Sequence, residues 1–482
     1  MSWTPRLELG DRDGAVYLRI AGAIQADVRA GVLRRGDRLP GTRAVAKSLG
    51  VHRNTVLAAW EELEAQGWIG TRPSSGTFVT ADLPPLLEAA PTPKSEAAGF
   101  DVEPPAFVPT YGDSADGALG LLAGKPDLRL VPGDLLGRAW RRVLATPRKA
   151  REVLSYGDPR GLPSLRRELT AMLAARRGVS ADADRIVVTR GAQNALFLAA
   201  QAIVRPGDAL LVEEMGFPPA WAAFRSAGAD VHPVPVDASG IRTDAIEQWI
   251  AAHGPPRAVY VTPHHQYPTM GVMGPGRRAR LMELARRHRF AIVEDDYDNE
   301  FHYDGQPVRP LAASDDAGVV VYVGTLSKVL APGLRLGYVV AAKPVIEAIA
   351  RVRRIVDRQG DRISEAAMAE LLADGTVPRH IRRVRRIYRQ RRLVLAQELR
   401  RQLGHVLELE VPPGGLAFWA RVTDDGVDIA AWQARCLERD LVFRIGQELH
   451  FDGSDPRHLR LGYAALDESE LIEAVRRMRA AL

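Results

Sequence analysis

The 482-residue sequence predicts an α/β protein with two folded parts, a small helical part ending in a β-hairpin and a large part built on a mostly parallel sheet. Length is the first observation, because 482 residues exceed one ordinary domain. The second is a proline-rich stretch near residue 100 that separates two regions with regular apolar periods. The third is an alternation of β-rich runs with helical segments after that stretch, which is typical of a parallel sheet covered on both faces.

Composition and charge favour a globular protein of the cytoplasm. The chain is 46% hydrophobic and 26% charged, and its single cysteine, Cys436, suits a reducing compartment. The N-terminal MSWTPRLELG has no apolar signal core, and no run of 18 apolar residues follows, so we expect neither export nor membrane insertion. The net charge of +6 suits nucleic acid without proving that it is bound.

The first part, residues 1–80, has the pattern of a winged helix-turn-helix. Helical periods cover 16–29 and 42–49, and a third helix begins near Arg53 with one apolar face. Two β-prone runs, 68–69 and 77–79, then flank a turn and predict a hairpin.

Short polar side chains at the start of the third helix are suited to base and phosphate contacts in the major groove. We therefore expect six residues of this part to contact double-stranded DNA: Arg43, His52, Arg53, Asn54, Thr55 and Gly76. The alternative is a winged-helix module used for protein contacts, with these polar residues merely solvated.

Residues 81–110 form the predicted linker, and 111–482 the large domain. Residues 81–110 hold seven prolines and one basic against five acidic residues, which predicts an extended, semi-stiff spacer. In the large domain the β-rich runs are 186–189, 209–212, 230–234, 258–261, 291–293, 319–323 and 337–340. Ligands of such sheets bind outside the carboxyl ends of the strands, so we examined the residues that follow each run.

Lys328 lies in TLSKVLAPGLRLGY, directly after a β-rich run. A cofactor with an aldehyde, a phosphate and a pyridine ring needs a lysine for a Schiff base and donors for the phosphate. Thr325, Ser327 and Arg335 are such donors. A single lysine in an ordinary surface segment would be solvated and unreactive, so the context carries the argument.

Three other strand ends supply the remaining groups. In AIVEDDYDNEF, Asp295 is placed to pair with a pyridinium N–H and Tyr297 to bond the ring hydroxyl, although an acidic loop that binds Mg²⁺ or water is the alternative. Ala192 and Gln193 open a helix whose free N–H groups can hold a phosphate. Phe217 can stack on the ring, or it can be an ordinary core residue.

The segment GDRLPGTRAVAKSLGVHRNTVLAAWEELEAQGWIGTRPSSGTFV resembles the DNA-binding domain of the GntR regulators. By that resemblance, Arg43, Arg53 and Gly76 match positions that contact DNA. Two positions depart from the pattern, Gly41 and His52, and a weaker helix cap at His52 is the expected cost.

The large domain resembles the fold-type I aminotransferases, and the whole chain resembles the MocR/GabR branch of the GntR regulators. The stretches that carry the likeness are YGDPRGLPSLR, VTPHHQYPT, EDDYDNEF and TLSKVLAPGLRLGY. The resemblance implies the fold of the pyridoxal 5'-phosphate (PLP)-dependent transferases of type I, with a seven-stranded sheet and a smaller C-terminal α+β subdomain.

The resemblance also implies a role for each matching residue. It assigns Lys328 to the internal aldimine, Asp295 to the ring nitrogen, Tyr297 to the ring oxygen, Phe217 to the ring face, and Ala192, Gln193, Thr325 and Arg335 to the phosphate. Tyr156 matches a tyrosine that reaches the phosphate from the neighbouring subunit, which implies a homodimer. Arg460 matches the arginine that binds the α-carboxylate of amino-acid substrates. Met270 stands where the family has glycine, which affects the local loop.

We expect no metal site. His264 and His265 are adjacent and lack a third ligand at a suitable spacing, so we interpret them as pocket or hydrogen-bonding residues.

Three functions are compatible with these residues. The first, which we favour, is a transcription regulator that senses an amino compound, or PLP itself, through the Lys328 aldimine. The second is an active aminotransferase with a DNA-binding head. The third is a regulator whose body has lost the cofactor, and the presence of Lys328, Asp295, Tyr297 and Arg335 argues against it.

Overall fold

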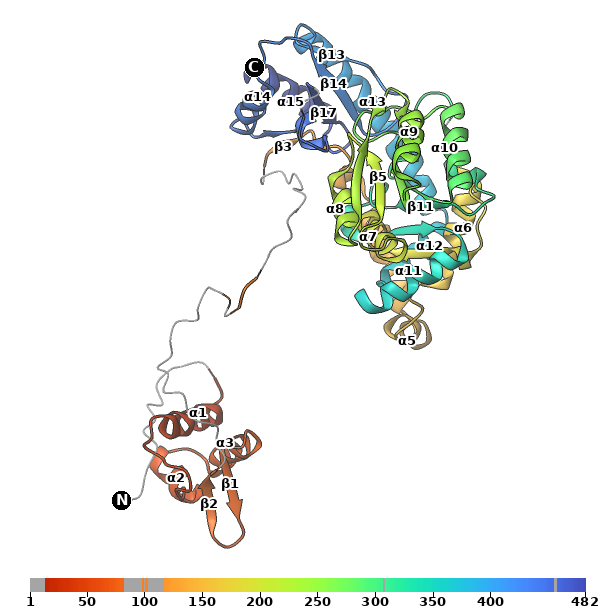
Figure 1. The fold of residues 1–482 in the computed structure, drawn as a ribbon. Helices are drawn as coiled ribbons and strands as arrows, with labels where there is room; N and C mark the ends of the chain where they lie inside the picture. The colour runs from red at the N-terminus through yellow and green to blue at the C-terminus, as the bar shows by residue number, and fades with distance from the viewer. Residues whose placement is uncertain (1–13, 82–97, 99, 103–116, 307, 455–456) are drawn as a thin grey trace. The chain divides into compact units, whose positions relative to one another are not determined.

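The computed structural model describes residues 14–81, 98, 100–102, 117–306, 308–454 and 457–482. It contains two compact units, Met1–Pro104 and Pro105–Leu482 (Figure 1). Almost all of the predicted linker, 81–110, lies outside the described residues.

The first unit is a winged helix, as predicted. Its elements are α1 (Val16–Arg29), α2 (Thr42–Leu49), α3 (Arg53–Ala65), β1 (Ile69–Arg72) and β2 (Gly76–Val79). The two strands pair antiparallel with Ile69 opposite Val79, and both residues are buried against the helices. Val56 and Leu63 of α3 are fully buried in the same core, which confirms the apolar face that the sequence predicted for this helix.

A seven-stranded sheet organises the second unit. Its order is β4-β12-β11-β10-β9-β5-β6, and only β12 runs antiparallel to its neighbours. The strands are β4 (Ile186–Thr189), β5 (Ala209–Glu213), β6 (Asp230–Val234), β9 (Ala258–Val261), β10 (Ala291–Asp296), β11 (Val320–Thr325) and β12 (Gly337–Val340). The mostly parallel seven-stranded sheet is therefore confirmed.

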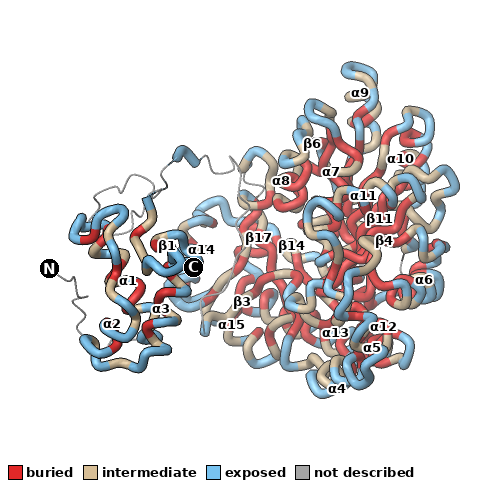
Figure 2. The backbone as a smooth tube through the Cα atoms, turned by 90° about the horizontal axis from the view of Figure 1, so that it is seen from below, coloured by how far each residue is buried: buried red, intermediate tan, exposed pale blue. Residues whose placement is uncertain are grey.

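Helices cover both faces of the sheet. Successive strand residues point to opposite faces, so each strand contributes apolar side chains to two cores that the helices cover. Ile292 belongs to one core and the adjacent Val293 to the other. The core of Val293 is covered by α7 (Gly191–Ile203), α8 (Pro218–Ser226) and α11 (Lys343–Val356). The core of Ile292 is covered by α4 (Gly133–Leu144), α5 (Pro147–Leu154), α6 (Pro163–Arg177), α9 (Thr243–His253), α10 (Pro275–His288) and α12 (Arg362–Ala373). Figure 2 shows the buried backbone concentrated in the strands between these layers.

The C-terminal subdomain has a core of its own around Tyr388, Phe418 and Trp432. Its four-stranded sheet has the order β13-β14-β17-β16. The elements are α13 (Thr376–Leu403), β13 (Leu407–Leu409), β14 (Ala417–Val422), α14 (Ile429–Leu437), β16 (Arg444–Ile445), β17 (His458–Gly462) and α15 (Glu468–Ala480). Two smaller pairs are β3 (Leu119–Gly120) with β15 (Leu441–Val442) and β7 (Val236–Asp237) with β8 (Gly240–Ile241).

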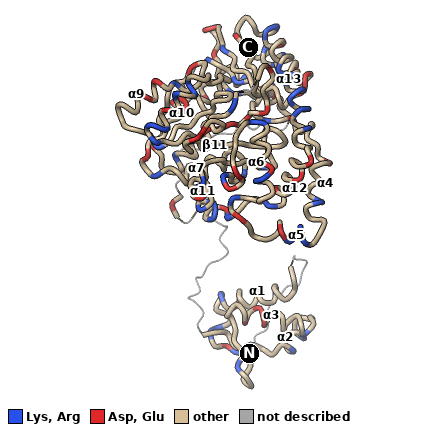
Figure 3. The backbone as a smooth tube through the Cα atoms, turned by 90° about the vertical axis from the view of Figure 1, so that its right-hand side faces the viewer, with Lys and Arg blue, Asp and Glu red and all other residues tan. Residues whose placement is uncertain are grey.

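The arginine-rich helix α13 is amphipathic. Its apolar residues at helical spacing, among them Ile381, Val384 and Leu399, are buried, while Lys and Arg positions recur along the helix (Figure 3). Arg391 and Arg392 are exceptions, because they are buried and paired with Asp127 at 2.8 Å and Asp304 at 2.6 Å. Among the described residues, no helix is both long enough and apolar enough to span a bilayer.

Strand β10 is longer than the sequence suggested. The apolar run predicted an end at Val293, but pairing with β11 continues to Asp296 opposite Gly324. Asp295 therefore lies inside the strand, opposite Val323, and is 4% exposed. The extension explains why this carboxylate is held rigidly instead of standing in a loop.

Gly337, on strand β12, packs closely against the backbone at the start of helix α7 and at the end of strand β11. A Cβ at this position would lie 2.7 Å from the carbonyl carbon of Gly191 and 3.0 Å from the oxygen of Gly324. We expect Gly337→Ala to lower the free energy of unfolding of the second unit by about 1–3 kcal/mol, because backbone atoms on both sides must shift. Urea unfolding measures the change. Gly333→Ala, where the added methyl meets nothing within 4 Å, is the control. Equal stability of the two variants would contradict this packing role.

Candidate functional site

Lys328 follows β11 at the carboxyl edge of the large sheet, in the segment that leads to β12. Its side chain is partly buried. Removal from water lowers the pKa of Lys328 to about 8; Arg460 acts in the same direction, and Asp295 opposes both. Gly124 lies against it, since a Cβ there would be 3.2 Å from Nζ. A lysine with this pKa is partly an uncharged nucleophile near neutral pH.

Asp295 presents one free carboxylate oxygen. The Tyr260 hydroxyl donates to Oδ2 at 3.0 Å, whereas Oδ1 is buried and has no hydrogen-bond partner in the described part of the chain. Burial raises the pKa of Asp295 to about 7, although the bond from Tyr260 lowers it. The sequence analysis did not identify Tyr260, because it stands in the apolar run AVYV, where an inward tyrosine looks like a core residue.

The start of helix α7 carries the two residues that the sequence predicted for the phosphate. Ala192 and Gln193 occupy its first turn, where backbone N–H groups are free of intrahelical partners. Arg335 lies beside it: Nη2 donates to the Arg190 oxygen at 3.0 Å, and a Cβ on Gly191 would be 3.4 Å from Cζ. The structure thus brings Arg335 and the first turn of α7 together.

Two hydroxyls stand at the end of β11. The Thr325 hydroxyl accepts from the Ser327 backbone N–H at 3.1 Å and donates to the Leu336 oxygen at 3.3 Å. The Ser327 hydroxyl is buried and has no hydrogen-bond partner among the residues with described positions. Together with Arg335, these groups offer donors for a phosphate next to Lys328.

Aromatic rings and an arginine face this edge. The Phe217 ring lies 5.4 Å from that of Tyr267, which lies 6.0 Å from that of Tyr297. The guanidinium of Arg460, on β17, lies 3.7 Å from the Tyr267 ring centre. Nε and Nη1 of Arg460 are buried and have no hydrogen-bond partner among the residues that the structure describes, so two nitrogens of this cation are available to an anionic ligand.

Met270 keeps a backbone conformation that favours glycine. Its φ is +67°, its side chain is 4% exposed, and the Tyr297 hydroxyl lies 3.9 Å from Sδ. A Cβ on Gly415 would collide with the Met270 methyl group. The methionine thus alters the surroundings of Tyr297 while the turn itself is retained.

Tyr156 is not brought to the site of its own chain. Its side chain is 73% exposed and lies under the Arg358 guanidinium at 3.7 Å. The predicted contact from a neighbouring subunit therefore remains a prediction.

The predicted DNA-contacting residues lie on the surface of the winged helix. Arg43, Arg53 and Asn54 are exposed, and Thr55 is half-buried. His52 caps α3, with Nδ1 accepting from the Asn54 backbone N–H at 3.3 Å.

Another arginine, Arg38, lies beside the hairpin turn. Gly76 has a φ of +107°, and a Cβ there would be 2.9 Å from Nε of Arg38. The sequence analysis missed Arg38, because its place beside the hairpin depends on folding.

Comparison with family models assigns both units. Residues 132–478 match the family described as "Aminotransferase class I and II", and residues 16–79 match "Bacterial regulatory proteins, gntR family".

Similar proteins agree with both matches. The "Probable rhizopine catabolism regulatory protein MocR" of Rhizobium meliloti is 30% identical over 98% of this chain and 94% of its own. The pyridoxine biosynthesis regulator PdxR of Corynebacterium glutamicum is 32% identical over 80% of this chain and 79% of its own. Among solved structures, an archaeal alanine:glyoxylate aminotransferase has a TM-score of 0.70 and 28% identity, over 75% of this chain and 90% of that one. The second solved structure is LysN, the α-aminoadipate aminotransferase of Thermus thermophilus complexed with N-(5'-phosphopyridoxyl)-L-leucine. It has a TM-score of 0.69 and 29% identity, and the match covers 76% of this chain and 92% of that one.

The depressed pKa of Lys328 is directly testable. We expect its reaction with an amine-selective reagent to accelerate as pH rises, with a midpoint near 8 in place of the ordinary 10.5, because only the deprotonated amine reacts. Peptide mass spectrometry of the labelled protein reports the rate. In Asp295→Asn the midpoint should fall further, since Asp295 raises the lysine pKa. In Asp425→Asn, whose side chain is 98% exposed, it should not move. A wild-type midpoint near 10 would refute the assignment.

Proposed function

The chain belongs to the aminotransferase class I and II family and, through its gntR-type head, to the MocR type of GntR regulators, and from this premise we propose that it is a PLP-dependent transcription regulator. Its second unit senses an amino compound or PLP itself, and its first unit binds operator DNA. One observation carries the proposal: a lysine of lowered pKa stands near buried polar atoms that have no hydrogen-bond partner among the described residues, namely Asp295 Oδ1, the Ser327 hydroxyl, and Nε and Nη1 of Arg460.

The chemistry of these groups fits PLP. Asp295 Oδ1 is an acceptor for a ring N–H, and Tyr297 is the donor beside it. The phosphate donors are Ala192, Gln193, Thr325, Ser327 and Arg335. Phe217 provides a ring face, and Arg460 a cation for a ligand carboxylate. When bound, PLP supplies an aldehyde carbon with which a primary amine forms a carbon–nitrogen double bond.

Lys328 can act as the reporter of ligand binding. An amino compound that competes with Lys328 for the aldehyde leaves this lysine free. With a pKa of about 8, the freed amine takes up a proton at neutral pH and places a new positive charge near Asp295 and Arg460. If the charge has a different free energy in two conformations of the unit, its appearance shifts the population from one conformation to the other. Such a difference in free energy is the requirement for a switch.

The winged helix converts the switch into altered DNA binding. Arg43, Arg53 and Asn54 are exposed, and cations and amides at the start of such a helix contact phosphates and base edges. Exposed Tyr156 supports a homodimer in which this residue completes the partner's phosphate site. Paired heads would then read two half-sites of an operator.

An aminotransferase is the second candidate function. Its supporting observation is Arg460, which lies close enough to Lys328 to lower the lysine pKa and is free to bind a substrate carboxylate. The solved structures to which this chain is similar are enzymes of this kind.

The deciding experiment follows absorption, product and DNA binding in the same samples. With PLP bound, we expect an amine effector to change the absorption and to alter affinity for DNA upstream of the chain's own gene by about 5- to 150-fold, the usual range of allosteric coupling. Lys328→Ala should lose both the borohydride-stable attachment of PLP and the coupling. Steady formation of a new amino acid from an amino donor and a keto acid, with DNA binding unchanged, would favour the enzyme instead.

Arg460 should determine whether the protein responds more strongly to amines that carry a carboxylate than to amines that lack one. We expect Arg460→Gln to weaken the response to α-amino acids by about 10- to 100-fold, because a charge-assisted bond contributes about 1.5–3 kcal/mol. The response to amines without a carboxylate should be kept. Titration of the absorption change gives both affinities. Arg421→Gln, which removes an exposed arginine paired with Glu408, is the control. An equal loss for both ligand classes would show that Arg460 does not read the carboxylate.

A further inference from the structure

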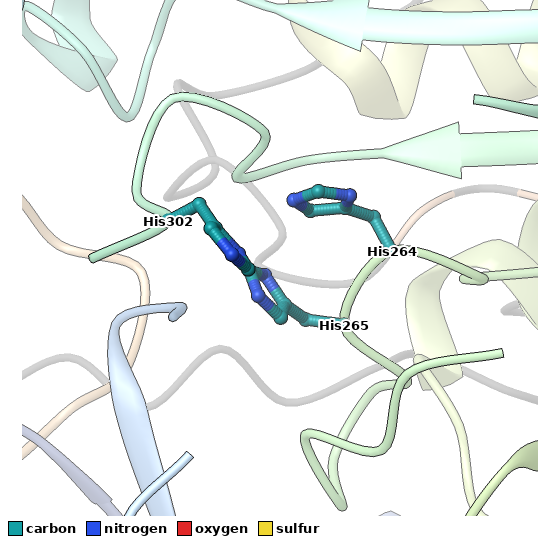
Figure 4. Close-up of side chains that lie close together, drawn as sticks. All are labelled: His264, His265 and His302. Carbon is teal, nitrogen blue, oxygen red and sulfur yellow. The ribbon is translucent and has the colours of Figure 1, made fainter. Parts of the chain in front are cut away.

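Three buried histidines converge beside the sheet edge. His264 and His265 follow β9, and His302 follows β10. Each offers a ligand atom, and these atoms lie within 4.8 Å of one another (Figure 4). The sequence analysis found no third ligand at a suitable spacing. Folding supplies it, because β9 and β10 are adjacent parallel strands whose carboxyl ends meet.

The hydrogen bonds fix the tautomers of the first two rings. His264 Nδ1 lies 3.2 Å from the Val308 oxygen, and His265 Nδ1 lies 2.8 Å from Asp298 Oδ1. Both partners only accept, so each Nδ1 carries a proton, and in the neutral ring Nε2 then keeps its lone pair. A metal-binding histidine shows the same arrangement, with its second nitrogen bonded to a carbonyl or carboxylate.

The remaining nitrogens have nothing to bind. Nε2 of His264, Nε2 of His265 and Nδ1 of His302 are buried and have no hydrogen-bond partner in the described part of the chain. The three side chains are 3%, 0% and 6% exposed. Buried polar atoms without partners are rare in proteins and call for an explanation.

We propose that His264, His265 and His302 bind one Zn²⁺ ion, with a fourth position open to water. Imidazole nitrogen is a preferred zinc ligand, at bonds of about 2.0–2.1 Å. In a tetrahedron such bonds place the nitrogens roughly 3.4 Å apart, so the rings must close from their present separation by small rotations. His265 packs against Gly414, since a Cβ added there would lie 2.5 Å from its Nε2.

The ion would fasten parts of the second unit that are distant in sequence. It joins the segments after β9 and β10, and His302 also forms a β-bridge with Gly414. The backbone N–H of Gly415 donates to the Phe301 oxygen at 2.7 Å. Zinc therefore ties the sheet edge to the segment that leads into β14 of the C-terminal subdomain.

Metal binding to the full-length protein tests the proposal. After treatment with a chelator, equilibrium dialysis against Zn²⁺ alone should give one ion per chain and a higher unfolding temperature. Co²⁺ in its place should give the visible absorption bands of a tetrahedral nitrogen site. His264→Asn and His302→Asn should each weaken Zn²⁺ binding by at least about 10-fold. His405→Asn, at an exposed histidine, should bind as the wild type does.

Two results would overturn the proposal. One is a wild-type protein that takes up less than one Zn²⁺ per chain and gives no Co²⁺ bands, a measurement that does not depend on how the variants fold. The other is folded His264→Asn and His302→Asn proteins, verified by circular dichroism, that keep wild-type affinity. Loss of PLP binding would affect neither readout, so this test is separate from that of the regulatory function.

Discussion

A lysine and an aspartate removed from water at one edge of a parallel sheet are the constraint on which the second unit depends. Burial opposes charge on both groups and moves the pKa of Lys328 to about 8 and that of Asp295 to about 7. Each group partly supports the charge of the other, and Tyr260 bonds one carboxylate oxygen. Pairing of β10 with β11 extends as far as Asp296, so Asp295 lies inside a paired strand.

The C-terminal subdomain completes the site that the sheet begins. Strand β17 brings Arg460 over the Tyr267 ring with two nitrogens unpaired, and the segment before β14 places Gly415 against Met270. Arg460 thus comes from the C-terminal subdomain, whereas Lys328 comes from the end of a strand of the large sheet. A change in how these two parts pack would move Arg460 relative to Lys328, and that is a physical basis for sensing.

The winged helix is a separate unit with a separate core. Its helices and hairpin bury Val56, Trp60 and Leu63 in one core of described residues. DNA contacts and ligand chemistry are therefore assigned to different units. A regulator needs this division, because the DNA-reading surface must remain intact while the sensing unit changes state.

The sequence by itself determined the features that follow from local pattern. Helix starts at Val16, Thr42 and Arg53 were predicted correctly from apolar spacing and turn residues, and so were the strands at 186–189 and 337–340. Lys328 and Asp295 were identified because each stands at a strand end beside other groups that the cofactor needs, and because the segments around them resemble the fold-type I aminotransferases. These signals lie within a few residues of each other, so one strand and its end are enough to show them.

Only the tertiary structure decided which distant groups meet. Tyr260 looked like one apolar residue among several, yet it bonds Asp295 because β9 and β10 are neighbours. His302 joins His264 and His265 for the same reason. Adjacency of strands, and the side to which each residue points, depend on how the whole sheet is assembled. No spacing along a single segment contains that information.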